Sequence, residues 1–252
     1  MREVQDQKMP IPEKFLQTWK SSEVPEKWRA SPAAIRQYHP TANYTLTTDA
    51  DNLQFVKDHF PEYLSLYQNF PREIYRADMV RYMWLYINGG IYLDLDLKLK
   101  KSLTNLFASD ADLYLVRTPN GGGYTNSFMA SKPRCEFWLR CLEEIRRRVE
   151  NLPWYIFGDW KVLYITGPGM ITDVLSKYNR PFVTIPYSLG HPCTVCDAYL
   201  GRPCGTGDTY IEELEGSSWT GGLTSIGYFI YCRWEWFLVF LIILLLLILL
   251  VF

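Results

Sequence analysis

In the segment NGGIYLDLDLKLKK, between Asn88 and Lys101, hydrophobic and polar residues alternate without interruption from Ile91 to Lys100. One side of the alternation is aliphatic, and the other carries acids and lysines: Ile91, Leu93, Leu95, Leu97 and Leu99 against Tyr92, Asp94, Asp96, Lys98 and Lys100. Because successive side chains of a strand point to opposite faces, this period of two predicts one strand over residues 91–100 with a polar outer face. Gly89 and Gly90, just before it, predict the end of a helix.

The rest of the pattern predicts strands that alternate with helices. Strands are expected at residues 15–19, 43–52, 111–118 and 182–189, the second of them turning into a helix near Asp49 or Asp51. Helices are expected at residues 25–38, 53–70 with a break at Pro61, 72–87, 135–151 and 164–178. This alternation predicts an α/β fold with a mostly parallel sheet.

The C-terminal segment differs from the rest of the chain, since residues 237–252 contain no polar side chain. At about 1.5 Å per residue, a helix from Trp234 to Phe252 nearly spans the roughly 30 Å hydrocarbon core of a bilayer. Trp234 and Trp236 stand where interfacial aromatic residues are common. We therefore expect a transmembrane helix at residues 232–252. Arg233 on its N-terminal side would, by the positive-inside rule, leave the preceding domain in the cytosol.

Composition narrows the classes of protein. A chain of 252 residues with 48% hydrophobic content has enough apolar residues for one sizeable core, and a net charge of −1 argues against nucleic acid as a partner. Cys193, Cys196 and Cys204 lie close to His191 and leave three interpretations open: a structural metal site, disulfides, or free thiols.

Two pairs of charged residues are candidates for chemistry. Asp94 and Asp96, two apart on the expected strand, share a face about 6–7 Å apart at Cα, and one hard cation can bridge them. The alternative is that they form only the solvated face of the strand. On the preceding helix, Asp78 and Arg81 are three apart and share a face, as a structural ion pair or as groups that reach a ligand held by the aspartates.

These residues belong to a longer segment, YRADMVRYMWLYINGGIYLDLD, that resembles the signature of the DXD sugar transferases grouped as glycosyltransferase family 32. Members include initiating α-1,6-mannosyltransferases and the mannosyltransferases of inositol phosphorylceramide. A looser resemblance covers residues 11–187. It implies the GT-A nucleotide-sugar fold, with a catalytic domain at residues 1–204, a loop that completes the site and a linker at 205–231, and the transmembrane helix at 232–252.

The resemblance also implies roles for individual residues. Asp94 and Asp96 would hold Mn²⁺ or Mg²⁺ against the diphosphate of a nucleotide sugar, a role that suits hard oxygen ligands. The positions that match donor-binding residues of the family are Trp19, Asp78, Arg81, Tyr92, Asn126 and Ser127. The family often has a histidine shortly before a C-terminal Ser-Trp, and this chain has none there. Glu213 or Glu215 would replace it as an oxygen ligand, and Ser218 with Trp219 would cap the phosphates.

The implied function is a membrane-anchored, metal-dependent, retaining glycosyltransferase of the Golgi or another endomembrane. GDP-mannose is the favoured donor, with a UDP-hexose as an alternative, and the acceptor would be an inositol phosphorylceramide-like lipid or a glycan. A glycoside hydrolase is disfavoured, because its two carboxylates face each other across a sugar from separate elements. A membrane protein that binds a nucleotide sugar or glycan without turnover is the other hypothesis, and the missing histidine is its support.

Overall fold

The computed structural model describes residues 10–119, 121–204, 207–216, 222–236, 238–239 and 242. A central sheet of six strands has the order β2-β1-β3-β6-β5-β7, and only β6 runs against the other five. Its strands are β1 (Lys14–Thr18), β2 (Asn43–Thr47), β3 (Gly90–Leu93), β5 (Leu113–Arg117), β6 (Tyr124–Ser131) and β7 (Val183–Ile185). The expectation of an α/β fold with a mostly parallel sheet is confirmed.

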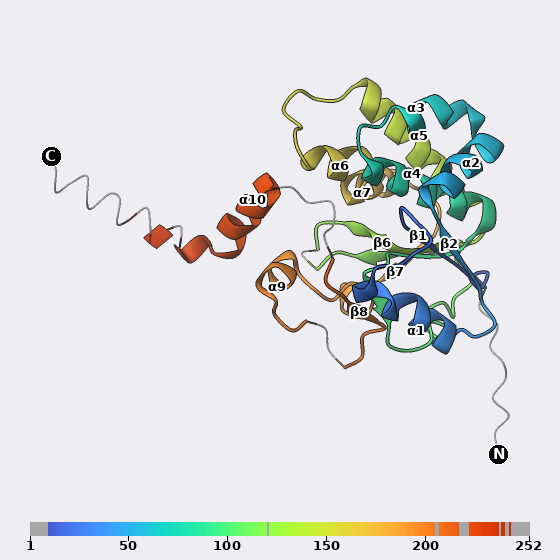
Figure 1. Cartoon of the computed structure of the whole chain (residues 1–252), viewed down its shortest axis with the longest axis horizontal. Coiled ribbons are helices and arrows are strands. Elements are labelled where there is room, and N and C mark those ends of the chain that lie inside the picture. Colours follow the sequence, from blue (N-terminus) through green and yellow to red (C-terminus); the bar gives the residue numbers. More distant parts are fainter. Residues whose placement is uncertain are drawn as a thin grey trace, which may run out of the picture.

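Helices cover the upper face of the sheet in Figure 1 and bury one side of each central strand. They are α2 (Asp49–His59), α3 (Leu64–Gln68), α4 (Glu73–Asn88), α5 (Glu136–Glu150), α6 (Trp160–Ile165) and α7 (Pro168–Ser176), with the short 3₁₀ turn Pro61–Tyr63 between α2 and α3. Leu16 of β1 and Tyr92 of β3 point into this layer, whereas their neighbours Phe15 and Ile91 point to the opposite one. Both faces of the sheet are therefore buried.

The second layer is smaller and contains α1 (Ala30–Tyr38) with a two-stranded sheet of β4 (Leu97–Leu99) and β8 (Ile211–Glu213). The 3₁₀ turn Glu26–Trp28 leads into α1, and α8 (Tyr187–Gly190), α9 (Val195–Leu200) and α10 (Gly222–Cys232) complete the described elements. In Figure 1 the second layer lies below the central sheet, and α10 extends to one side of the molecule.

The single strand expected over residues 91–100 is wrong. The chain forms β3, turns at residues 94–96, and continues as β4 in the other sheet. The turn is closed by a hydrogen bond from the Leu97 amide to the Asp94 carbonyl (3.0 Å), while the Asp94 amide donates to the Ser127 carbonyl (2.8 Å). The leucines stay buried on both sides of the turn, so the alternation persists although the direction of the chain changes. Tyr92, expected on a polar face, is buried because helices cover that face.

The two glycines between α4 and β3 act as expected at the helix end. Gly89 follows the last residue of α4 with φ of 60°, and Gly90 has φ of 94°. A Cβ on Gly90 would lie 2.4 Å from the Lys14 carbonyl oxygen, closer than any contact allows. Both positions therefore need glycine for their backbone conformation, and Gly90 also for the close approach of β3 to β1.

The C-terminal part contains more structure than the loop expected at residues 205–231, since β8 and α10 lie there. The expected transmembrane helix falls largely outside the described residues. Within the described part of the chain, no helix is both long and apolar enough to cross a membrane.

The cysteine cluster forms disulfides. Cys193 is bonded to Cys204, and Cys196 to Cys232, which joins α9 to the end of α10. The interpretation as a metal site with His191 is therefore wrong, because the sulfurs are already paired. Cys135 and Cys141 are buried thiols.

Candidate active site

A cavity of about 510 Å³ opens where β1 and β3 end, between the turn after β3 and helices α4 and α6. This lies within the range of about 300–1,000 Å³ typical of small-molecule sites. Seven of the residues expected at a donor site line it: Trp19, Asp78, Arg81, Tyr92, Asp94, Asp96 and Asn126. The cavity is also lined by residues that the sequence pattern did not predict for the site: Thr18, Lys20, Trp28, Asp49 and Arg72.

Asp94 is held firmly at the inner end of the turn. Its Oδ1 accepts hydrogen bonds from the Tyr92 hydroxyl (2.5 Å) and from Arg81 Nη1 (3.1 Å). Both partners are almost fully buried, and the guanidinium lies 4.4 Å from the centre of the Tyr92 ring. One carboxylate oxygen is thus committed to the protein, which fixes the direction of the other.

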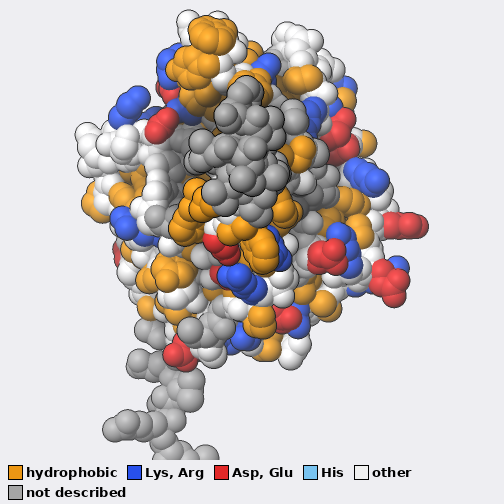
Figure 2. Space-filling view, turned by 90° about the vertical axis from the view of Figure 1, so that its left-hand side faces the viewer, with side chains coloured by type: hydrophobic (Ala, Val, Ile, Leu, Met, Phe, Trp, Pro, Cys, Tyr) orange, Lys and Arg blue, Asp and Glu red, His pale blue; other side chains and the backbone are white. Residues whose placement is uncertain are grey.

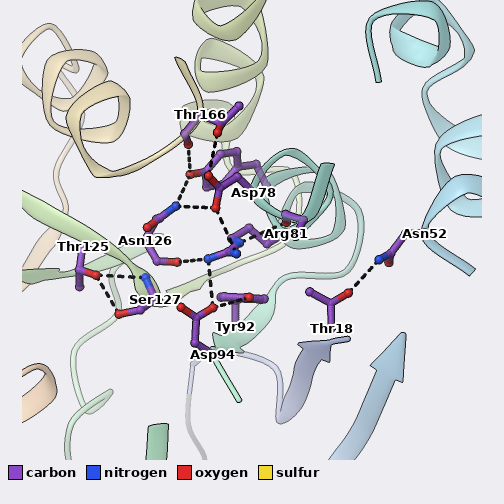
Figure 3. Close-up of polar contacts among 12 residues, drawn as sticks. Thr18, Asn52, Asp78, Arg81, Tyr92, Asp94, Thr125, Asn126, Ser127 and Thr166 are labelled. Carbon is purple, nitrogen blue, oxygen red and sulfur yellow. Dashed lines mark hydrogen bonds and ion pairs between the residues drawn. The ribbon is translucent and has the colours of Figure 1, made fainter. Parts of the chain in front are cut away.

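Arg81 connects the turn to α4 and β6 (Figure 3). It pairs with Asp78 (Nη2 to Oδ1, 3.1 Å) and donates to the Asn126 carbonyl (2.9 Å) and to the Ala77 carbonyl (3.2 Å). The three-residue spacing of Asp78 and Arg81 therefore forms the expected ion pair, and the arginine also reaches Asp94. With so many acceptors around it, Arg81 acts as a rigid support beneath the cavity.

Asp78 is completely surrounded by donors. Besides Arg81, the Asn126 amide donates to its Oδ1 (3.0 Å) and the Thr166 hydroxyl to its Oδ2 (2.7 Å). Burial raises the pKa of Asp78, and Arg81, Thr166 and Asn126 oppose that shift. Thr166 belongs to the segment TGPG that contributes to the family resemblance, but nothing in its spacing indicated contact with a residue 88 positions away.

Asp96, at the outer end of the turn, has a different environment. The Leu214 amide, next to β8, donates to the Asp96 backbone carbonyl (2.7 Å), and Glu213 pairs with Leu97 across the β4–β8 ladder. Burial, followed by the charges of Asp94 and Glu213, raises the pKa of Asp96 to about 7. Three carboxylates are therefore gathered at one place, and the charge of Asp96 is poorly compensated there.

His191 lies at this acidic corner, although it is far from the expected Ser-Trp segment. Its Nδ1 is 3.0 Å from Glu213 Oε1, and the Cys193 amide donates to the same oxygen (2.9 Å). Burial lowers the pKa of His191, but the charges of Glu213, Asp96 and Asp94 outweigh burial and the pKa is raised. A histidine thus lies beside the acidic residues of the turn, but it comes from another segment than the family's histidine and does not line the cavity.

The other expected residues lie in different positions. Glu215 contributes its backbone carbonyl, which accepts a hydrogen bond from Trp28 Nε1 (2.7 Å), and Trp28 packs edge-on against Trp19 with 4.9 Å between ring centres. The Ser127 carbonyl accepts a hydrogen bond from the Asp94 amide, and Ser127 does not line the cavity. Ser218 and Trp219 lie outside the described residues.

The residues around the turn suit a hard divalent ion. Asp96 and the free oxygen of Asp94 present carboxylate oxygens, with Glu213 beside them, and these are the ligands that such ions prefer. Among the described residues, no three side chains of His, Cys, Asp or Glu converge into a complete metal centre. An ion here would therefore take other ligands from water or from a phosphate, as Mg²⁺ commonly does.

A mostly parallel sheet, with an Asp-x-Asp turn after a central strand and a cavity where the strands end, defines an α/β domain with a ligand site at the carboxyl ends of its strands. Its fold is that of the solved structure "PaToxG Glycosyltransferase", with a TM-score of 0.50 and 17% identity over 66% of this chain and 69% of that one. Residues 25–113 match the family described as "Glycosyltransferase sugar-binding region containing DXD motif". The chain thus carries this glycosyltransferase region, and the resemblance seen in the sequence is confirmed.

Curated relatives agree with this family. The chain is 30% identical to "Inositol phosphoceramide mannosyltransferase 3" of Schizosaccharomyces pombe, over 92% of this chain and 61% of the relative. It is 32% identical to "Mannosyl phosphorylinositol ceramide synthase SUR1" of Saccharomyces cerevisiae, over 68% of this chain and 43% of that protein. The matches therefore span about half of the relatives' length.

Proposed function

We propose that the protein is a glycosyltransferase that moves mannose from GDP-mannose to an inositol phosphorylceramide-like lipid. The observation that carries the proposal is the turn Asp94–Asp96, held by Arg81 and Tyr92 at the mouth of a cavity large enough for a nucleotide sugar. The choice of mannose and of the lipid rests on the names of the relatives. A glycan acceptor and a UDP-hexose donor are the alternatives that the assay below includes.

In this proposal Trp19 flanks the nucleoside, and Tyr92, buried beneath it, holds Asp94 in place. Asp94 and Asp96, with Glu213 beside them, would hold Mn²⁺ or Mg²⁺, whose charge would neutralise the departing diphosphate. Asp78, Arg81 and Asn126 shape the inner end of the cavity, where the sugar would lie. Ser218, Trp219 and Glu215 would close the phosphate side. The role of Arg81 is to position Asp94, because its N–H groups already have protein acceptors.

The chemistry would proceed with retention of configuration. The acceptor oxygen forms a bond to the anomeric carbon, the bond to the diphosphate oxygen breaks, and the acceptor proton passes to that departing oxygen. Positioning and stabilisation of the leaving diphosphate supply the catalysis. The rigid network beneath Asp94 supports this mechanism, because fixed groups need no reorganisation during the reaction.

We also propose that the domain faces the lumen of an endomembrane compartment, with residues 232–252 as its membrane helix. Two disulfides support this placement, since structural disulfides persist in oxidising compartments and are rare in the cytosol. This inference is preferred to the cytosolic side suggested by the single Arg233.

The test is release of nucleoside diphosphate from a panel of GDP- and UDP-sugars with Mn²⁺, with and without ceramide-type and glycan acceptors. We expect turnover of GDP-mannose, reduced about 100-fold or more in Asp94→Ala and in Asp96→Ala, as for the loss of other electrostatic groups at active sites. Asp58→Ala, an exposed carboxylate on α2, is the matched control and should leave the rate unchanged. Nucleotide binding without turnover of any donor would instead establish the non-catalytic binder.

A further inference from the structure

Four large aromatic side chains stand exposed between the end of α5 and the first residue of α6. Trp154 is 93% exposed, and the other three are about two-thirds exposed: Tyr155, Phe157 and Trp160. Single exposed apolar residues are ordinary, but a contiguous group of this size marks a surface that meets a partner or a membrane.

The loop is tied to the rest of the molecule through Asp159. Its Oδ1 accepts a hydrogen bond from Arg72 (2.7 Å), at the start of α4, and its Oδ2 accepts one from Thr224 of α10 (2.6 Å). Arg72 lines the cavity, and α6, which begins at Trp160, supplies Val162 and Leu163 to the same lining. The exposed aromatic residues therefore lie next to the cavity and to α10.

Helix α10 continues this apolar surface. Apart from Ser225, its exposed side chains are hydrophobic, and two exposed tryptophans follow it: Ile226, Phe229, Ile230, Tyr231, Trp234 and Trp236. Figure 1 places the α5–α6 loop and α10 on the same side of the molecule, and Figure 2, which views that side, shows groups of hydrophobic side chains on it. We call Trp154, Tyr155, Phe157 and Trp160, together with the exposed hydrophobic side chains of α10 and the two tryptophans after it, the aromatic face.

We propose that the aromatic face docks onto the surface of a lipid bilayer and holds the cavity against it. Two observations select a bilayer as the occupant. The face is rich in tryptophan and tyrosine, which favour the membrane–water interface. It also runs directly into residues 237–252, sixteen consecutive residues without a polar side chain. The docking needs no enzymatic turnover; that it delivers a lipid acceptor to the cavity rests on the function proposed above.

The first experiment measures depth in the membrane. A single cysteine is introduced in the full chain as Phe157→Cys and labelled with an environment-sensitive fluorophore, since Cys135 and Cys141 are buried and the other cysteines are paired. The protein is reconstituted in phosphatidylcholine vesicles that contain lipids with a doxyl quencher. Lys57→Cys, exposed on α2 at the opposite side of the molecule, is the control.

We expect a blue-shifted emission and strong quenching of the label at position 157, with neither at position 57. Membrane attachment through the C-terminal segment alone would leave both labels unquenched and would overturn the proposal. An absence of quenching, together with a molecular mass that doubles as the protein concentration rises, would also overturn the proposal. That result would show that the aromatic face binds a second copy of the chain.

The second experiment links the face to the acceptor. We expect the double variant Trp154→Ser/Trp160→Ser to raise KM for a vesicle-borne ceramide-type acceptor about tenfold, with donor hydrolysis unchanged. Tyr187→Ser, which removes an exposed aromatic outside the face, should change neither. An unchanged KM in the double variant would contradict the delivery role. If no variant and no wild-type protein turns over a donor, the proposed function fails, and the fluorescence result still decides the docking.

Discussion

The two aspartates of the turn, Asp94 and Asp96, are only two residues apart, yet their surroundings differ. Asp94 is bound by Arg81 and Tyr92, so its position is set before any ligand arrives. Asp96 faces Asp94 and Glu213 without comparable compensation, and burial first, then these two charges, raise its pKa to about 7. One aspartate therefore provides a fixed point, and the other provides the surplus of charge that favours a cation.

This difference predicts a pH dependence of stability in the absence of divalent ions. Between the unfolded pKa of Asp96, near 3.8, and the folded value of about 7, the folded protein binds a proton that the unfolded chain has released. The free energy of unfolding contributed by Asp96 therefore falls as pH rises from about 4 to about 7. Asp96→Asn removes this contribution, so the variant should gain stability relative to wild type across that range.

Thermal unfolding in EDTA between pH 4 and pH 8 measures the effect. Wild-type and Asp96→Asn curves of Tm against pH should diverge, and added Mn²⁺ should close the gap at pH 7 by stabilising the wild type alone. Curves that stay parallel would show that burial and the charges of Asp94 and Glu213 do not raise the pKa of Asp96 in the folded protein.

At the scale of elements, the connection between α4 and β3 determines the position of the turn at residues 94–96. Gly90 brings β3 so close to β1 that a side chain at this position would strike the Lys14 carbonyl. β3 in turn positions Tyr92 and, one residue beyond its end, Asp94. The two glycines therefore help to position the residues of the site, in addition to ending helix α4.

Gly90→Ala is therefore expected to destabilise the protein by about 2 kcal/mol or more, from an unfavourable φ and a direct clash. Gly121→Ala is the matched control, because Gly121 also has a positive φ (68°) but no atom within 4 Å of the added methyl. Urea unfolding of both variants separates the two causes. Equal losses of stability would contradict the role given to the β1–β3 approach.

The sequence predicted well those elements whose formation depends on residues close together in the chain. The amphipathic helix α5, the start of α2 at Asp49 and the Gly-Gly end of α4 are all visible in local pattern. The pairing of β4 with β8 was not, because each strand has three residues and Leu97 pairs with Glu213 from the far end of the chain. The position of His191 beside Glu213 was missed for the same reason, because the sequence connected this histidine only with the nearby cysteines. Asp78, Arg81 and Asp94 were found because a contiguous segment carries them.

At the scale of the whole molecule, two disulfides tie the C-terminal part together around the acidic corner of the site. Cys193–Cys204 spans 11 positions and Cys196–Cys232 spans 36. The second bond connects α9, close to His191, with the helix that carries half of the aromatic face. The site and the face are thus linked covalently as well as by packing.

Replacing both Cys196 and Cys232 by serine should lower the free energy of unfolding by about 3–4 kcal/mol, from the loop-closure entropy of a 36-residue separation. Replacing Cys193 and Cys204 should cost about 1 kcal/mol less, because that loop is shorter. Denaturant unfolding of the two double variants measures both values. A larger loss from the shorter loop would mean that native-state contacts, and not chain entropy, dominate.

The Cys196–Cys232 bond also makes a closed ring of chain that contains β8, Glu213 and the connection to α10. A protease that cuts inside this ring opens it without releasing either piece. The apolar C-terminus would stay covalently joined to the catalytic part, and the cut would become visible only after reduction. The protein can thus lose the continuity of its backbone next to the site and still remain one molecule.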